Sequence, residues 1–149
     1  MASVKLQFDS ANTTILDPNA TLANGARKAV DYNNAAKLDL EATAYLSVMF
    51  DTTAPSANTI VAELYLIPHD TVNIPEGGDG SVGSDDTPQK EFLVAAFETI
   101  NPSLLAAEVL GTLPFRLWEH NRFVLRNTSG QIFSEEWTLT LQPAKRQVV

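Results

Sequence analysis

Hydrophobic and polar residues alternate with a period of two along much of the chain. In the clearest case, residues 38 to 50, apolar side chains occupy every second position: Leu38, Leu40, Ala42, Ala44, Leu46, Val48 and Phe50. A helix would scatter these residues around its circumference, whereas a strand that buries one face requires this pattern. The run is longer than a usual strand, so we expect a bulge or bend near Ala42–Ala44.

The same pattern predicts strands elsewhere in the chain. The predicted strands are residues 4–8, 13–16, 26–32, 58–67, 91–98, 115–118, 122–126 and 137–142. Pro68 ends the strand at 58–67, whose inward residues should be Ile60, Ala62, Leu64 and Leu66. The segment 91–98 has apolar residues on both faces, which suits a central strand, and Ser103–Leu110 fits either two helical turns or a short strand, of which we favour the strand.

The last two predicted strands are separated by the turn-forming residues Asn127–Gly130, and this arrangement predicts a closing β-hairpin. About eight to ten strands separated by turn signals predict an all-β fold: an antiparallel β-sandwich, jelly-roll-like, formed by residues 1–149 as a single domain. The glycine-rich and acidic segment 75–88 predicts a long flexible loop. Met1–Ser10 and Ala144–Val149 are predicted terminal arms that a partner would order.

Charge and cysteine content exclude several kinds of site. The 149 residues carry 18 acids against 10 bases, a formal net charge of −8, which disfavours binding to nucleic acid or to an anionic membrane surface. No window approaches the roughly 18 apolar residues of a membrane-spanning helix. The chain has no cysteine, which excludes disulfides, thiolate metal sites and cysteine nucleophiles.

The sequence gives no pattern of catalytic or metal-binding residues. His69 and His120 have no nucleophile motif beside them, and we interpret both as solvated loop histidines. The adjacent acids Glu135–Glu136 and Asp85–Asp86 would point to opposite faces of an extended chain, so neither pair can flank a bond by itself. Asp79, Asp85 and Asp86 lack the spacing of an EF-hand loop. We therefore expect no enzymatic activity, no cofactor and no metal.

Five aromatic residues are candidates for a platform on which a sugar stacks: Trp118, Trp137, Tyr32, Tyr45 and Tyr65. Trp137 shares a face with two leucines and is therefore predicted to lie in the core. Tyr45 and Tyr65 lie opposite the apolar faces of their strands, so both are expected to be exposed or covered by a partner.

Three segments and one loop carry a resemblance to a known family. The strand Ala62–Pro68, the acidic glycine-rich loop, the strand Phe92–Phe97 and the segment Phe123–Gln131 resemble the jelly-roll head decoration (cement) proteins of tailed bacteriophages. The resemblance covers about residues 58–143. It implies a virion structural protein, made in the host cytoplasm, that binds and stabilises the head shell on the capsid surface. The implied partners are the major capsid protein and further copies of the chain, in a dimer or trimer.

The alternation and the termini supply four candidate interface residues: Tyr45, Tyr65, Lys145 and Arg146. The resemblance implies that the turn is a further contact point, which adds Asn127 and Gln131. A carbohydrate-binding or adhesion module, of a phage tail or a cell surface, is the alternative, and it would show an aromatic patch or a groove with polar groups. A sandwich enzyme would need histidines or carboxylates gathered inside the barrel, and two histidines in predicted loops count against it.

Overall fold

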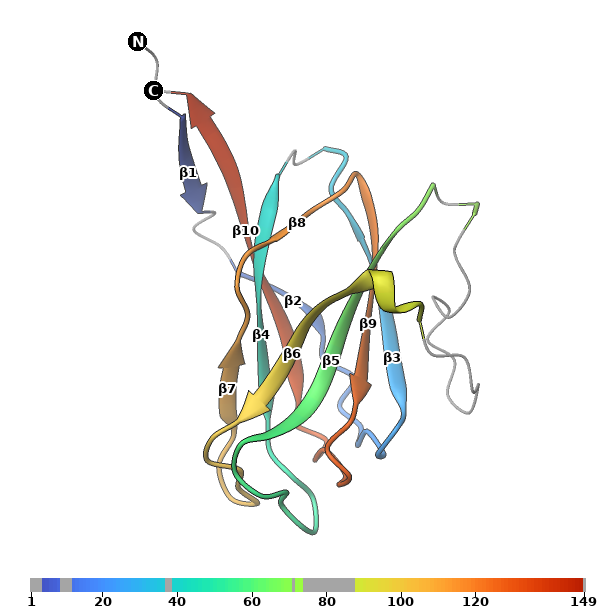
Figure 1. Cartoon of the computed structure of the whole chain (residues 1–149), viewed down its shortest axis with the longest axis vertical. Helices are drawn as coiled ribbons and strands as arrows, with labels where there is room; N and C mark the ends of the chain where they lie inside the picture. Colours follow the sequence, from blue (N-terminus) through green and yellow to red (C-terminus); the bar gives the residue numbers. More distant parts are fainter. Residues whose placement is uncertain (1–3, 9–11, 37–38, 71, 74–87, 149) are drawn as a thin grey trace.

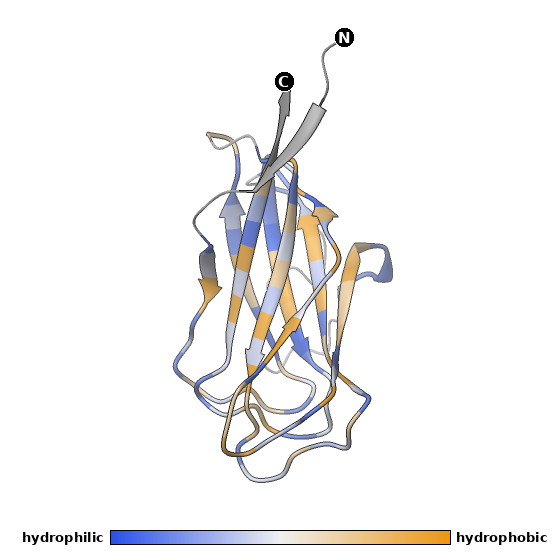
Figure 2. Cartoon of the chain, turned by 90° about the vertical axis from the view of Figure 1, so that its left-hand side faces the viewer, coloured by the Kyte–Doolittle hydropathy of each residue, from blue (hydrophilic) through white to orange (hydrophobic). Residues whose placement is uncertain are grey.

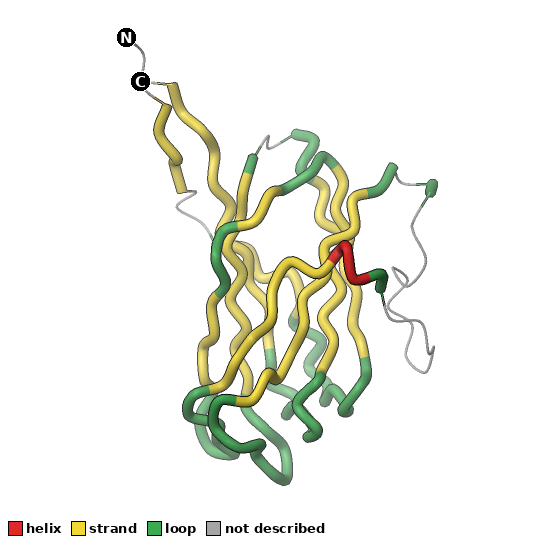
Figure 3. Tube along the Cα trace, in the orientation of Figure 1, coloured by secondary structure: helices red, strands yellow, loops and turns green. Residues whose placement is uncertain are grey.

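A computed structural model describes residues 4–8, 12–36, 39–70, 72–73 and 88–148, with the side-chain surroundings described between residues 12 and 144. Of the predicted acidic loop at residues 75–88, residues 75–87 lie outside the described residues, and so do the three aspartates that were weighed as calcium ligands. Within the described residues the chain forms strands and one short 3-10 helix (Figure 3).

The strands form two antiparallel sheets that pack face to face (Figure 1). The sheet called here the β10 sheet contains β1 (Val4–Phe8), β2 (Thr13–Leu16), β4 (Glu41–Val48), β7 (Glu108–Gly111), β8 (Phe115–Arg116) and β10 (Thr138–Val148). The β9 sheet contains β3 (Arg27–Asn33), β5 (Thr59–Pro68), β6 (Leu93–Thr99) and β9 (His120–Asn127). The 3-10 helix η1 (Lys90–Phe92) leads into β6.

The order of the strands is that of a jelly roll. In the β10 sheet, β10 lies between β2 and β4, and β7 follows β4; in the β9 sheet the order is β3, β9, β5, β6. Most successive strands therefore lie in different sheets, and the chain closes when β10 pairs with β1 and β2 near its start. Two four-stranded Greek keys wound in this way are the jelly-roll architecture. The predicted antiparallel, jelly-roll-like sandwich is confirmed.

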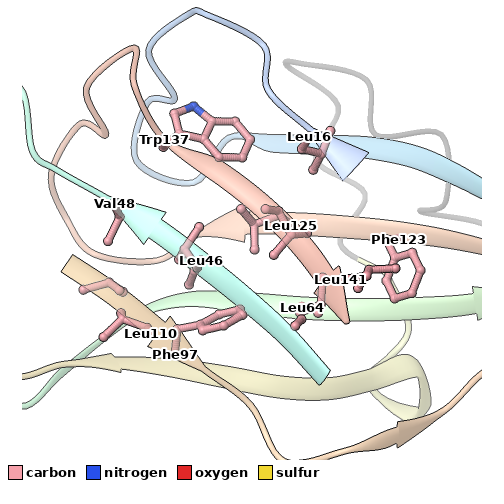
Figure 4. Close-up of a cluster of buried hydrophobic side chains, with 14 of the residues drawn as sticks. Leu16, Leu46, Val48, Leu64, Phe97, Leu110, Phe123, Leu125, Trp137 and Leu141 are labelled. Carbon is pink, nitrogen blue, oxygen red and sulfur yellow. The ribbon is translucent and has the colours of Figure 1, made fainter. Parts of the chain in front are cut away.

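The core lies between the two sheets, where apolar side chains from strands of both sheets meet (Figure 4). Hydrophobic and polar residues alternate along several of these strands (Figure 2). Ala42, Ala44, Leu46 and Val48 are buried while their neighbours in β4 are half-buried, which is the alternation that the sequence predicts. Trp137 is 1% exposed, and its indole N–H donates to the carbonyl of Ala20 at 2.9 Å. Its predicted place in the core is confirmed.

The predicted closing hairpin is wrong. β9 pairs with β3 and β5, whereas β10 pairs with β1, β2 and β4, so residues 128–137 cross from one sheet to the other. Alternation shows which face of a strand is buried but not which strand lies beside it. Turn-forming residues occur in such crossing connections as well as in hairpins.

Three further boundaries differ from the sequence interpretation. β4 begins at Glu41, and Leu40 before it is exposed. The pairing of β4 with β10 has a continuous register, so the bulge expected near Ala42–Ala44 does not lie on this edge. The register shifts on the other edge of β4, where β7 gives way to β8. β6 lies at the end of its sheet rather than at its centre. The ambiguous segment 103–110 is a strand only from Glu108 onward.

The two ends of the chain pair with each other. Val4–Phe8 runs antiparallel to Ala144–Val148, and this two-stranded ribbon extends beyond the body of the sandwich (Figure 1). Within the described residues, the two predicted arms therefore supply hydrogen bonds to each other. The ribbon places β1 on the same edge of β10 as β2.

Candidate binding site at one end of the sandwich

A cavity of about 380 Å³ opens at the end of the sandwich where β3 connects to β4 and β8 connects to β9. Its walls are Asn34, Ala35, Asp39, Leu40, Arg116, Leu117, Trp118 and Glu119. We call this cavity the Trp118 pocket. It lies within the size range of pockets that hold small molecules.

Two buried asparagines hold the loops that form the pocket. The Asn34 side-chain amide donates to the carbonyls of Asp39 and Trp118, at 2.6 and 3.2 Å, and its oxygen accepts from the Asp39 N–H at 3.0 Å. Asn121 donates to the carbonyls of Trp118 and Tyr32 and accepts from the Trp118 N–H. Both side chains satisfy main-chain groups that a loop would otherwise bury without partners, so the pocket is held in shape before any ligand arrives.

The pocket combines an aromatic ring with charged groups. Trp118 is 42% exposed, and the guanidinium carbon of Arg116 lies 4.1 Å from the centre of its ring, a cation–π contact that orients both side chains. Both Asp39 and Glu119 line the Trp118 pocket, where Asp39 is buried and Glu119 is exposed. These groups can stack on a ring and exchange hydrogen bonds with a polar ligand.

A second polar cluster lies at the same end of the molecule. Arg122 donates from Nε and Nη2 to the two carboxylate oxygens of Asp31, at 2.7 and 2.8 Å, and His69 Nε2 lies 3.4 Å from Asp31 Oδ1. The Arg122 hydrogen bonds, helped by His69 and opposed by burial, lower the pKa of Asp31 below its usual value. The cluster ties the end of β5 to β3 and β9.

The prediction that both histidines are solvated loop residues is wrong. The imidazole of His69 is buried, and its ring centre lies 6.1 Å from that of His120, which begins β9. The sequence suggested a loop after Pro68, but the antiparallel pairing of β3, β5 and β9 brings Asp31 and His120 against that loop.

Among the residues that the structure describes, no three or more histidine, aspartate or glutamate side chains are grouped closely enough to hold a metal ion. No helix in the described ranges is both long and apolar enough to cross a membrane.

Tyr45 lies on the outer face of the β10 sheet, as the alternation predicts, and is half-buried there. Its hydroxyl donates to Gln142 Oε1 at 3.2 Å, and a Cβ at Gly111 would lie 3.3 Å from its ring, so the ring rests closely against β7. A shallow cavity of about 310 Å³ lies beside it, with Ser47, Val109 and Thr140 among its walls.

Tyr65 lies on the outer face of its strand, as the alternation predicts, but it is only 3% exposed, so the prediction of an exposed ring is wrong. It packs with Ile67 and Val124 on the outer face of the β9 sheet, and Phe92 of η1 covers this small cluster. The hydroxyl donates to the Glu63 carboxylate, and burial together with that contact raises the pKa of Tyr65 to about 12. Alternation could not show that η1 would cover the outer face.

Asn127 is also buried rather than accessible. Its amide donates to the carbonyls of Leu22 and Gln131, at 2.9 and 2.7 Å, and its oxygen accepts from the N–H and hydroxyl of Ser129. The Asn127 side chain therefore holds the turn together and is not available to a partner. Gln131 is half-buried beside it.

Lys145 and Arg146 belong to the part of β10 that pairs with β1, where they lie opposite Gln7 and Leu6. The six candidate interface residues thus occupy separate regions: two outer sheet faces, the turn after β9 and the terminal ribbon. The sequence interpretation considered Trp118 as a platform aromatic but missed Asn34 and Arg116. No sequence signal links these three residues, because the fold alone brings their loops together.

Comparison with known proteins gives no relative. No protein-family model, no curated protein and no solved structure matches this chain.

Proposed function

We propose that the chain is a virion structural protein that decorates the head shell of a tailed bacteriophage, where it binds the major capsid protein as a homo-oligomer. One observation carries the proposal: the segments that resemble head decoration proteins are neighbours in space. Ala62–Pro68 lies in β5, Phe92–Phe97 is mostly β6, and Phe123–Gln131 covers β9 and its turn. In the order β9, β5, β6 they form a continuous part of one sheet, although long stretches of chain separate them.

The terminal ribbon suits the same role. It extends beyond the sandwich, and each of its two strands has one edge that no other described strand covers. A shell presents the same site many times, so modest contacts from a ribbon and a sandwich face sum through avidity. Jelly rolls serve as viral capsid domains, an analogy at the level of the fold alone.

The test is co-sedimentation of the purified protein with empty shells of its source particle that lack it. We expect saturable binding at a fixed ratio to the major capsid protein. Shells already saturated with unlabelled protein are the control and should take up no more. If a folded protein stays in the supernatant at every salt concentration tried, the proposal is wrong.

A carbohydrate-binding function is the second candidate, and the Trp118 pocket favours it. Sugar-binding sites combine an aromatic surface with carboxylates and amides that hydrogen-bond hydroxyl groups, and this pocket offers Trp118, Asp39 and Glu119 in a concave wall. Lectin domains also use the jelly-roll fold.

A glycan array, followed by titration of any bound sugar, tests this second candidate. Trp118→Ala should abolish binding, whereas Leu105→Ala, which shortens another exposed apolar residue, should leave it unchanged. Binding to no glycan, or equal binding by the Trp118→Ala variant, would exclude a sugar site in this pocket.

A further inference from the structure

β7 presents an open strand edge. Among the described strands it hydrogen-bonds to β4 alone, on one side. The Thr112 N–H donates to the Ala44 carbonyl at 3.0 Å, so Thr112 is one of the residues whose backbone groups point toward β4. Since residues in such a ladder alternate between the two edges, the N–H and C=O groups of Val109 and Gly111 point away from β4, toward the open edge.

Over its own length, β7 lacks the usual protection against pairing with another strand. Natural edge strands carry lysine, proline, inward charges or bulges. β7 and the two residues after it contain neither lysine nor proline, and Pro114 follows directly after them. The register of β7 with β4 is regular from Glu108 to Gly111, and it shifts by one residue only before β8. Val109 is 66% exposed and Leu113 is 86% exposed, so the open edge presents aliphatic side chains to solvent.

The only charged residue of β7 is turned away from the open edge. The Glu108 carboxylate accepts hydrogen bonds from the Thr99 hydroxyl and from the N–H groups of Ile100 and Asn101, the last two at 3.1 and 2.7 Å. An acidic protein of net charge −8 therefore has an uncharged strand edge. Two copies can approach each other there with the least electrostatic repulsion.

We propose that a second copy of this chain covers the edge, through antiparallel pairing of β7 with β7 about a two-fold axis at Gly111. Gly111 pairs with the same residue of the second copy, exchanging two N–H···O=C hydrogen bonds. Val109 then lies opposite Leu113 of the second copy, so the two exposed aliphatic residues cover each other. This self-complementarity is what selects a second copy over an unrelated strand, because a two-fold contact uses the same patch on both partners. The β10 sheets of the two copies become one continuous sheet.

This inference deepens the homo-oligomeric part of the proposed function and names its interface. The experiments below use the purified protein alone. A failed dimer therefore leaves binding to the shell untouched, and a failed shell experiment leaves the dimer untouched.

The first experiment measures the mass in solution by sedimentation and light scattering. We expect the wild-type chain, of 16.2 kDa, to give a concentration-dependent mass approaching twice that value. Val109→Lys places an edge lysine and should weaken the dimer at least tenfold. Val72→Lys adds the same charge at an exposed valine outside β7 and should leave the dimer unchanged. Salt should strengthen the dimer, because it screens the repulsion between two acidic copies.

The second experiment locates the contact by cross-linking, which the absence of native cysteine makes specific. In a Val109→Cys/Leu113→Cys variant, mild oxidation should give a covalent dimer joined from position 109 of one copy to position 113 of the other. Val109→Cys alone should not cross-link, since four residues of strand separate the two positions by about 13 Å, too far for a disulfide.

A strictly monomeric wild-type chain overturns the proposal. A dimer that Val109→Lys leaves intact, while circular dichroism shows that the variant is folded, overturns it as well. Cross-links only between other positions would place the interface elsewhere on the molecule.

Discussion

At the scale of single residues, buried asparagines join parts of the chain that are far apart in sequence. Asn34 and Asn121 hold the Trp118 pocket, and Asn127 ties the end of β9 to the connection before β3. The sequence predicts that Asn127 is a turn residue on the surface, because asparagine favours turns wherever they lie. Burial depends on the packing of other loops, which the local sequence does not encode.

Asn127→Ala should lower the free energy of unfolding by about 3 kcal/mol, because it removes the hydrogen bonds of a buried amide and leaves the buried Ser129 N–H without its acceptor. Gln131→Ala is the matched control, since Gln131 joins this network through main-chain groups. Urea denaturation of both variants measures the difference. Equal, small losses of stability would show that Asn127 has no special structural role.

Trp137→Ala should cost about 3–5 kcal/mol, the usual loss for removing a buried large aromatic side chain. Trp118→Ala removes the other tryptophan, from an exposed position, and should cost much less. The measurement is the chemical unfolding midpoint of each variant. Native-like stability of the Trp137→Ala variant would mean that this ring is not a core residue.

Glu108 should make stability depend on acid pH. Burial opposes its ionisation, but hydrogen bonds from Thr99, Asn101 and Ile100 outweigh burial and hold its pKa below the ordinary value of 4.5. The native state therefore binds this proton less readily than the unfolded chain. Its stabilising contribution is complete above the ordinary pKa and disappears as pH falls through the lowered value.

Thermal melts of the wild type and the Glu108→Gln variant from pH 7 to pH 3 measure this contribution. The wild type should melt higher at neutral pH, and the gap should narrow in acid. A gap that stays constant over the whole range would contradict the assigned hydrogen bonds.

At the scale of elements, the sequence predicted strands and their buried faces well, because alternation is a local property. β2, β3, β4 and β5 lie close to their predicted ranges. Pairing was predicted less well, because it depends on residues far away in the chain. β9 and β10 have the alternation of a hairpin yet lie in different sheets, and β6 is apolar on both faces yet lies at an edge.

The terminal ribbon should be separable from the sandwich. A variant that lacks residues 1–9 loses β1, whose described pairing is with residues 144–148 alone, while β2 keeps its own pairing with Leu139–Leu141. We expect its melting temperature to fall by only a few degrees, and its binding to shells to weaken strongly. Loss of the folded state would show instead that β1 is essential to the sandwich.

At the scale of the whole molecule, the jelly roll separates three surfaces. The Trp118 pocket lies at one end, and the open edge of β7 lies at the edge of the β10 sheet opposite to β1. The terminal ribbon extends beyond the sandwich (Figure 1). In the proposed assembly β7 joins two copies, the ribbon and sandwich contact the shell, and the Trp118 pocket stays available. The six candidate interface residues predicted from the sequence lie in separate parts of the molecule. Alternation indicates which face of a strand a residue occupies, but it does not indicate how the loops are arranged.

The central claim is that this protein belongs to a phage head, and the amount of it in purified particles tests that claim most directly. Quantitative mass spectrometry of intact virions and of isolated heads should find the chain in both, at a fixed, simple ratio to the major capsid protein. Absence from virions, or a few copies that separate with the tails, would contradict the claim.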